Sequence, residues 1–372
     1  MPDQWKRANI TPIPKVDHPT TWSDYRPISL TSNLCKTFER ILAKYIISLT
    51  SEIWQTNKQH GFLPGKSTID AIVTVTDNWG QAMDIKKTIV AIFFDFAKAF
   101  DLVDHELLLE KLQRLLPTWL VSWIAAYLSG RKQRVKVGDI ETEWMDVAAG
   151  VIQGSVLGPI LFIIFISDIN DYMPEGVELE KYAGDILNYI IGKATSTNLP
   201  QEVVDAVQRW CIVNKMRLNT TKCKVMHIHG SDTEVVKPKL LLNGVELEVV
   251  DSYKYLGVEL NTTLDWNQQW QRVKSLTNST PFLLKQLRRS GFERKILVNV
   301  YRSLVLSHFN YSSPLLASAS RSDKHEMQAL QRRLFRIIGI NPTEARNDHN
   351  IPDIETLIEN VAVSKIKKVL AD

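Results

Sequence analysis

One run of eight residues, TIVAIFFD at 88–95, constrains the fold more than any other segment of the chain. Its β-branched and aromatic side chains are typical of a strand, and its nearly continuous apolar character requires burial inside a sheet. The run ends in a carboxylate, Asp95. We therefore expect a buried strand that carries an acidic side chain at its C-terminal end.

The remaining segments predict a mixture of hairpins and helices. Short, proline-punctuated runs at 9–15 and 24–30 predict a hairpin, and so do KQRVKVGDIETEW at 132–144 and VELEKYAGDILNYII at 177–191. The runs KVMHI and 250–260 predict two short strands, the second with a glycine inside it. Helical spacing of apolar side chains is found at 33–56, 67–83, 105–116, 118–128, about 155–170, 199–216 and 267–338, the last with breaks at Pro281 and Gly291. The fold class that follows is α+β, with an antiparallel sheet and a helical C-terminal lobe.

Composition excludes several classes of protein. A length of 372 residues suggests two or three domains. Three scattered cysteines, Cys35, Cys211 and Cys223, cannot form a disulfide framework or a zinc site, so a reducing, intracellular setting is expected. The N-terminus lacks the apolar core of a signal peptide, and the longest apolar run, at 156–169, is too short to span a membrane.

Charge is distributed unevenly along the chain. Residues 267–340 contain 13 Lys and Arg against 3 Asp and Glu, so this part carries +10 while the whole chain carries only +4. The other residues therefore sum to −6. This asymmetry fits one lobe that binds a polyanion and one that binds cations, although a solvated helical surface explains the same composition equally well.

Two acidic positions are candidates for a metal site. Asp95 ends the buried strand, with Asp101 six residues later, and Asp185 lies in the turn of the hairpin at 177–191. Carboxylates from a strand end and a hairpin tip can hold hard divalent cations, and two such ions about 3.5–4 Å apart support phosphoryl transfer. Taken alone, an aspartate in a turn is more often only a turn former.

The order of seven motifs gives this site a context. The chain contains DYRPISL, QHGFLPGKST, FFDFAKAFDLVDH, GVIQGSVLGPILF, KYAGDILNY, LNTTKCKVM and YKYLGVEL, in that order. The series, over about residues 5–340, resembles the reverse transcriptase of non-LTR (LINE or jockey-like) retrotransposons. The resemblance implies a right-hand polymerase with fingers (1–90), a palm that carries the metal site (91–262), a basic helical thumb (263–340) and a C-terminal tail (341–372).

The resemblance also implies roles for residues of the palm. Asp95, the backbone carbonyl of Phe96 and Asp185 would hold two Mg²⁺ ions, and Lys222 would protonate the leaving pyrophosphate as a general acid. Phe100 matches the position of a sugar gate that clashes with a ribose 2′-OH, and a core aromatic is the alternative for it.

Other carried-over residues would contact the nucleotide, template or primer. Gln153 and Gly154 would line the nucleotide and template pocket, beside Ile152 where the family usually has proline. Lys15, Arg26 and Lys66 are candidate contacts of the triphosphate or the template. Tyr255, Leu256 and Gly257 correspond to the primer grip.

One departure from the family pattern bears on activity. Gly184 stands where the motif Tyr-Ala-Asp-Asp has its first aspartate, so a metal-ligating anion is missing. A glycine would also suit a type I′ hairpin turn. A sequencing error is a third explanation, because a single base change separates the codons of Asp and Gly. Loss of this ligand should cost orders of magnitude in rate.

The expected function is therefore RNA-directed DNA synthesis on a DNA primer with dNTPs, impaired in this copy. The alternative is a catalytically dead remnant that only binds nucleic acid. No membrane association is expected, and no endonuclease domain or Cys/His zinc knuckle is recognisable in the chain.

Overall fold

The apolar run at 88–95 forms β3 (Thr88–Asp95), the central strand of a five-stranded sheet in the order β12-β9-β3-β8-β7. The computed structural model describes residues 1–192, 198–230 and 237–371. β3 pairs antiparallel with both of its neighbours, β8 and β9, and only the short β12 pairs parallel with β9. The other strands of this sheet are β7 (Glu178–Tyr182), β8 (Asp185–Gly192), β9 (Lys224–Ile228) and β12 (Glu248–Val249).

Alternate residues of β3 belong to two hydrophobic clusters on opposite faces of the sheet. Val90, Ile92 and Phe94 pack among helices α1, α4, α5, α6 and α7. Ile89, Ala91 and Phe93 pack on the other face, which is covered by α3, the β13–β14 hairpin and the C-terminal helices. This two-residue period is the reason why the strand has apolar side chains at nearly every position. The helices of this body are α1 (Asn33–Leu49), α2 (Ser51–Thr56), α3 (Thr68–Asp84), α4 (His105–Gln113), α5 (Thr118–Leu128), α6 (Leu157–Phe165) and α7 (Leu199–Val213).

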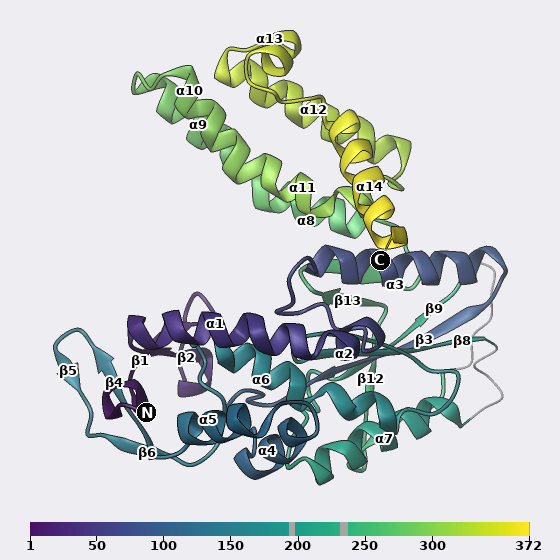
Figure 1. Cartoon of the computed structure of the whole chain (residues 1–372). Helices are drawn as coiled ribbons and strands as arrows, with labels where there is room; N and C mark the ends of the chain where they lie inside the picture. Colours follow the sequence, from purple (N-terminus) through teal and green to yellow (C-terminus); the bar gives the residue numbers. More distant parts are fainter. Residues whose placement is uncertain (193–197, 231–236, 372) are drawn as a thin grey trace.

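A second sheet joins the N-terminus to residues far along the chain. β1 (Arg7–Pro14) and β2 (Tyr25–Leu30) form the predicted antiparallel hairpin. β4 (Arg131–Val137) pairs parallel with β1, so residues 131–147 share a sheet with the first thirty residues. This sheet lies at one end of the molecule in Figure 1. Its small partner strands are β5 (Ile140–Glu141) and β6 (Met145–Val147), and a separate two-stranded sheet is formed by β10 (Leu241–Leu242) and β11 (Val245–Glu246).

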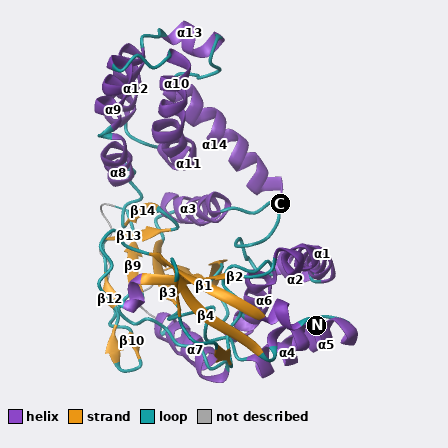
Figure 2. Ribbon diagram, turned by 90° about the vertical axis from the view of Figure 1, so that its left-hand side faces the viewer, coloured by secondary structure: helices purple, strands orange, loops and turns teal. Residues whose placement is uncertain are grey.

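The basic C-terminal region forms a helical lobe, as its spacing predicts. The lobe projects from the side of the five-stranded sheet that α3 covers (Figures 1 and 2). The last helix packs on α11 and α3, where Ile354 and Ile358 are buried in the same cluster as the rest of the lobe. Within the described residues, no helix has the length and apolar character needed to cross a bilayer. The lobe contains α8 (Asn267–Thr277), α9 (Thr280–Arg289), α10 (Arg294–Tyr301), a π-helical segment (Arg302–Leu306), α11 (Ser307–Leu316), α12 (Arg321–Ile338), α13 (Pro342–Asn347) and α14 (Ile354–Ala371).

Two sequence predictions are wrong in detail. The segment 250–260 is a hairpin and not one strand: β13 (Ser252–Tyr255) and β14 (Val258–Asn261) are joined by Leu256 and Gly257, whose φ values of 46° and 86° are those of a type I′ turn. The helix predicted at 155–170 ends at Phe165 and continues as a 3₁₀ helix over Ser167–Tyr172.

Candidate metal centre and nucleotide site

The strand register brings the two candidate carboxylates together. Asp95 at the end of β3 is the direct partner of Asp185 at the start of β8. Directly opposed residues of an antiparallel pair have Cα atoms about 4.5–5.5 Å apart and side chains on the same face. The two side chains therefore meet at one edge of the sheet, well within the distance of about 10 Å that a shared pair of ions requires.

The electrostatics of this pair favour a bound cation. Burial, and then the charge of Asp95, raise the pKa of Asp185 to about 6, although the Asp185 side chain still reaches solvent and the cationic Lys222 opposes the shift. Lys222 Nζ lies 3.4 Å from Asp95 Oδ2, so the proposed general acid lies beside the proposed metal ligands. Two repelling carboxylates form an oxygen donor set that suits a hard divalent ion. In the part of the chain that the structure describes, no group of three or more Asp, Glu, His or Cys side chains is arranged so that it could hold a metal ion.

Backbone bonds fix the residues that follow Asp95. The N–H of Asn219 donates to the Asp95 carbonyl at 2.8 Å, and the N–H of Ala97 donates to the Arg217 carbonyl at 2.8 Å. These bonds flank Phe96, whose side chain is buried against Trp210. They hold the end of β3 against the loop that leads to Lys222.

The turn at Gly184 does not need glycine. Ala183, and not Gly184, has the positive φ, at 54°, so the signs of φ match a type II′ turn and the type I′ explanation is wrong. A β-carbon built at Gly184 would lie 3.5 Å from Phe162 Cζ and 3.6 Å from Ala99 Cβ, which are ordinary contacts. Neither the backbone nor the space around this position explains why an aspartate is missing.

Phe100 is a partly buried ring next to this turn. It stacks on Phe162 with ring centroids 4.8 Å apart, and it meets Phe62 edge-on at 6.2 Å. Because Phe162 also faces Gly184, the three positions adjoin one another. One side of the ring is therefore packed as in a core, which the alternative expected.

Gln153 and Gly154 contact the N-terminal hairpin directly. The N–H of Ser29 donates to the Gln153 carbonyl at 2.7 Å. Gly154 has a φ of 109°, and a β-carbon there would lie 2.6 Å from the Ser29 carbonyl oxygen. Close approach to β2 is therefore what requires glycine here. Ile152 is buried, and Gln153 lines a cleft of about 380 Å³ together with Asp101 and Lys132.

The basic candidates occupy different surroundings. Arg26 lies opposite Ile13 on the arms of the β1–β2 hairpin and is exposed. Lys15 follows β1, and its Nζ donates to the Ser23 carbonyl at 2.8 Å. Its charge also acts on Asp101, whose pKa burial raises while Lys98 and Lys15 lower it. Lys66 is half-buried in the turn before α3.

The hairpin at 252–261 links the carboxylates to the C-terminal helices. Tyr253 stacks on Phe93 at 4.0 Å, and burial followed by the charges of Asp185 and Asp95 raises the pKa of Tyr253 to about 12. The Tyr311 hydroxyl of α11 donates to the Leu256 carbonyl and lies against Gly257. Tyr255 itself is 3% exposed, so it supports the hairpin from within. Sequence reasoning missed Tyr253, although it shares the motif YKYLGVEL.

Comparison with known proteins agrees with this arrangement. The family model described as reverse transcriptase (RNA-dependent DNA polymerase) matches residues 13–260. The chain is 28% identical to the RNA-directed DNA polymerase from mobile element jockey of Drosophila melanogaster, over 99% of this chain and 42% of that protein. It is 30% identical to the probable RNA-directed DNA polymerase from transposon BS of the same species, over 96% of this chain and 41% of that protein. The chain thus spans about two fifths of the length of these relatives.

Solved structures show the same fold at low sequence identity. Apo telomerase from Candida tropicalis superposes with a TM-score of 0.51 at 12% identity, covering 99% of this chain and 66% of that one. Telomerase of the same species in complex with a fragment of telomeric RNA gives 0.50 at 13% identity, covering 100% and 63%. The α+β polymerase fold predicted from the motifs is confirmed. The chain belongs to the reverse transcriptase family, and its domain is of the type found in the RNA-directed DNA polymerases of jockey-like non-LTR retrotransposons.

Proposed function

We propose that this domain binds an RNA template, a DNA primer and a dNTP, and that its capacity to extend the primer is strongly reduced. The observation that carries this proposal is the direct pairing of Asp95 with Asp185 beside a turn that has lost its third carboxylate. Reverse transcriptases in general depend on divalent metal ions. Two Mg²⁺ ions would supply activation of the primer 3′-OH and charge neutralisation of the leaving pyrophosphate.

The residues of the chain have separate tasks in this proposal. Asp95 and Asp185 hold the cations, with the Phe96 carbonyl as an additional oxygen donor. Lys222 holds a proton within reach of the site and donates it to the leaving group. The Phe100 ring restricts the space at the 2′ position of the sugar. The segment Gln153–Gly154 lines the nucleotide pocket and is held against β2. Lys15, after β1, and Arg26, on β2, bind the phosphates.

The C-terminal helices provide the grip on the primer–template duplex. Of their basic residues, Lys285, Arg288, Arg289, Arg332, Arg333 and Arg336 are all exposed. The Tyr311 contact attaches these helices to the primer-grip hairpin. Binding through such a surface does not depend on sequence and weakens steeply with salt.

Gly184 is the reason for the expected loss of rate. Phosphoryl transfer depends on positioning and charge neutralisation, so two carboxylates in place of three stabilise the transition state less. A deficit of about 3–4 kcal/mol corresponds to a loss of about 10²–10³-fold in rate.

Primer extension on poly(rA)/oligo(dT) tests the proposal. We expect little extension by the unaltered chain and a gain of about 10²-fold or more in Gly184→Asp. Gly138→Asp, which adds the same charge in the turn after β4, is the matched control and should give no gain. Efficient extension by the unaltered chain would contradict the argument about the missing ligand.

A second candidate function is nucleic-acid binding alone, which the vacant carboxylate position favours. In that case Gly184→Asp stays inactive while the chain still binds primer–template with strong salt dependence. Absence of both extension and binding would refute both candidates.

A further inference from the structure

A short segment before α3 lies against the turn that carries the metal site. Asn57–Gly61 runs beside β7, where the N–H of His60 donates to the Lys181 carbonyl at 2.8 Å and the N–H of Lys181 donates to the Lys58 carbonyl at 3.0 Å. These bonds form a parallel bridge between Gln59 and Lys181. The segment therefore extends the central sheet by one residue pair, immediately before the turn Ala183–Gly184.

Gln59 contacts this turn with its side chain. It is 1% exposed, and its Oε1 accepts hydrogen bonds from the N–H of Ala183 at 2.9 Å and from the N–H of Gly61 at 2.7 Å. Ala183 has a φ of 54°, a conformation that costs a non-glycine residue about 1–2 kcal/mol. One oxygen atom thus accepts the partly buried N–H of the residue where the turn is strained.

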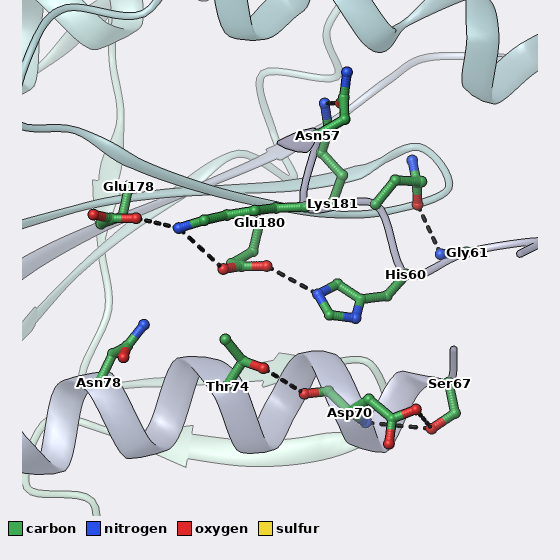
Figure 3. A network of polar contacts seen from close by, with 12 residues as sticks. Asn57, His60, Gly61, Ser67, Asp70, Thr74, Asn78, Glu178, Glu180 and Lys181 are labelled. Carbon is green, nitrogen blue, oxygen red and sulfur yellow. Dashed lines mark hydrogen bonds and ion pairs between the residues drawn. The ribbon is translucent and has the colours of Figure 1, made fainter. Parts of the chain in front are cut away.

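The fit between segment and turn is tight on its other side as well. A β-carbon at Gly61 would lie 2.4 Å from the Ala183 nitrogen, so only glycine allows this approach. Side-chain bonds anchor the segment to β7, since His60 Nε2 lies 3.0 Å from Glu180 Oε2 (Figure 3). Lys58 also pairs with Glu178 and Glu180. The anchoring bonds hold the backbone on both sides of Gln59 against β7.

We propose that Gln59 is a positioning residue of the polymerase site: its amide oxygen fixes the backbone of Ala183 and thereby the direction in which Asp185 presents its side chain to the metal ions. The inference rests on the proposed function for its catalytic consequence, but its structural part does not. A displacement of about 1 Å at reacting groups can cost about 10²-fold in rate. The buried amide thus belongs to the site although it touches no substrate.

Amide hydrogen exchange of the β7–β8 hairpin tests the structural part without any need for activity. Gln59→Met keeps the length and volume of the side chain and removes the acceptor. We expect exchange at Ala183 to become faster by about tenfold or more, since its buried bond is lost. Gln331→Met is the matched control, because Gln331 is also buried and its Oε1 accepts from the N–H of Ile354 at 2.8 Å, far from the hairpin. It should lower the melting temperature without a change at Ala183.

Steady-state kinetics in the Gly184→Asp chain test the catalytic part. We expect Gln59→Met to lower kcat by about tenfold or more, with the KM for primer–template unchanged. Gln331→Met should leave kcat unchanged. If Gly184→Asp has no activity, the proposed function fails, and the exchange measurement still decides whether Gln59 holds the turn.

Either of two results would overturn the inference. One is unchanged amide exchange at Ala183 in a folded Gln59→Met chain. The other is an unchanged kcat when Gln59→Met is added to the Gly184→Asp chain. Should Gln59→Met not fold, Gly61→Ala perturbs the same contact from the other side, because its new methyl group must displace the turn. It should then produce the same faster exchange and lower kcat, and normal values for both would equally refute the role of the contact.

Discussion

Asp185→Asn should stabilise the metal-free chain at neutral pH, although it removes a proposed metal ligand. The pKa of Asp185 is raised to about 6 by burial and then by the charge of Asp95, against an ordinary value of 3.8. Between these two values the folded chain binds more protons than the unfolded chain does. The free energy of unfolding therefore falls as pH rises from about 4 to about 6, and it stays lower above that range.

The size of this effect follows from the shift and from the exposure of the side chain. A shift of about two pKa units corresponds to about 3 kcal/mol at most. Because Asp185 reaches solvent, screening reduces the expected value to about 1 kcal/mol. Asp185→Asn should be more stable than the unaltered chain by this amount at pH 7, and equally stable at pH 3.5.

Urea denaturation in EDTA at pH values from 3.5 to 8 measures the difference. Asp139→Asn, in the exposed turn after β4, is the control and should leave the pH profile unchanged. Parallel profiles for Asp185→Asn and the unaltered chain would refute the reasoning. A less stable Asp185→Asn chain at pH 7 would do the same.

Three further predictions concern other parts of the molecule. Gly154→Ala should lower the free energy of unfolding in urea by about 3 kcal/mol, because residue 154 has a φ of 109° and the new methyl group meets a carbonyl of β2. The control Gly138→Ala, where φ is 60° and a methyl group has no neighbour within 4 Å, should lower it by about 1 kcal/mol, and equal losses would show that contact with β2 is unimportant. In the Gly184→Asp chain, Phe100→Val should raise incorporation of ribonucleotides relative to deoxynucleotides by about tenfold, and unchanged discrimination would make the ring a core aromatic only. Arg333→Gln should reduce the salt dependence of primer–template binding by about one unit of slope, and an unchanged slope would place the nucleic acid elsewhere.

Local patterns in the sequence were sufficient for the elements but not for the contacts between them. The strand at 88–95 and the hairpins at 9–30 and 177–191 were predictable because a short β-branched and aromatic run, and turn residues between two such runs, are local signals. The hairpin at 252–261 was predicted as one strand because Leu256, which has positive φ, is not a typical turn residue. The N-cap of α12 is Ser320, whose side chain accepts the N–H of Asp323 at 3.1 Å; Asp323 is itself a good capping residue type, so the local pattern does not separate the two positions.

In the candidate site too, the sequence predicts single residues better than the contacts between distant segments. Nothing in the local pattern places Asp95 opposite Asp185, which is 90 positions later, and only the order of the motifs suggested it. The role of Gln59 was missed for the same reason, since its contact with Ala183 joins residues 124 positions apart. Gly61 in QHGF was the available signal, because a glycine in a buried segment often marks a close approach of two backbones.

In the function proposed above, the turn at Gly184 keeps the polymerase fold while the chemistry at the site is weakened. A third carboxylate beside Asp95 and Asp185 would add repulsion to a pair in which the pKa of Asp185 is already raised, so metal-free stability and metal binding oppose each other at this position. The contacts with the turn come from the Gln59 side chain and from the close approach of Gly61 to Ala183, and neither involves the side chain of residue 184. Glycine in place of aspartate would therefore remove a proposed metal ligand and leave the contacts of Gln59 and Gly61 with the turn unchanged, and this is the physical reason to expect that Gly184→Asp restores activity in an otherwise intact site.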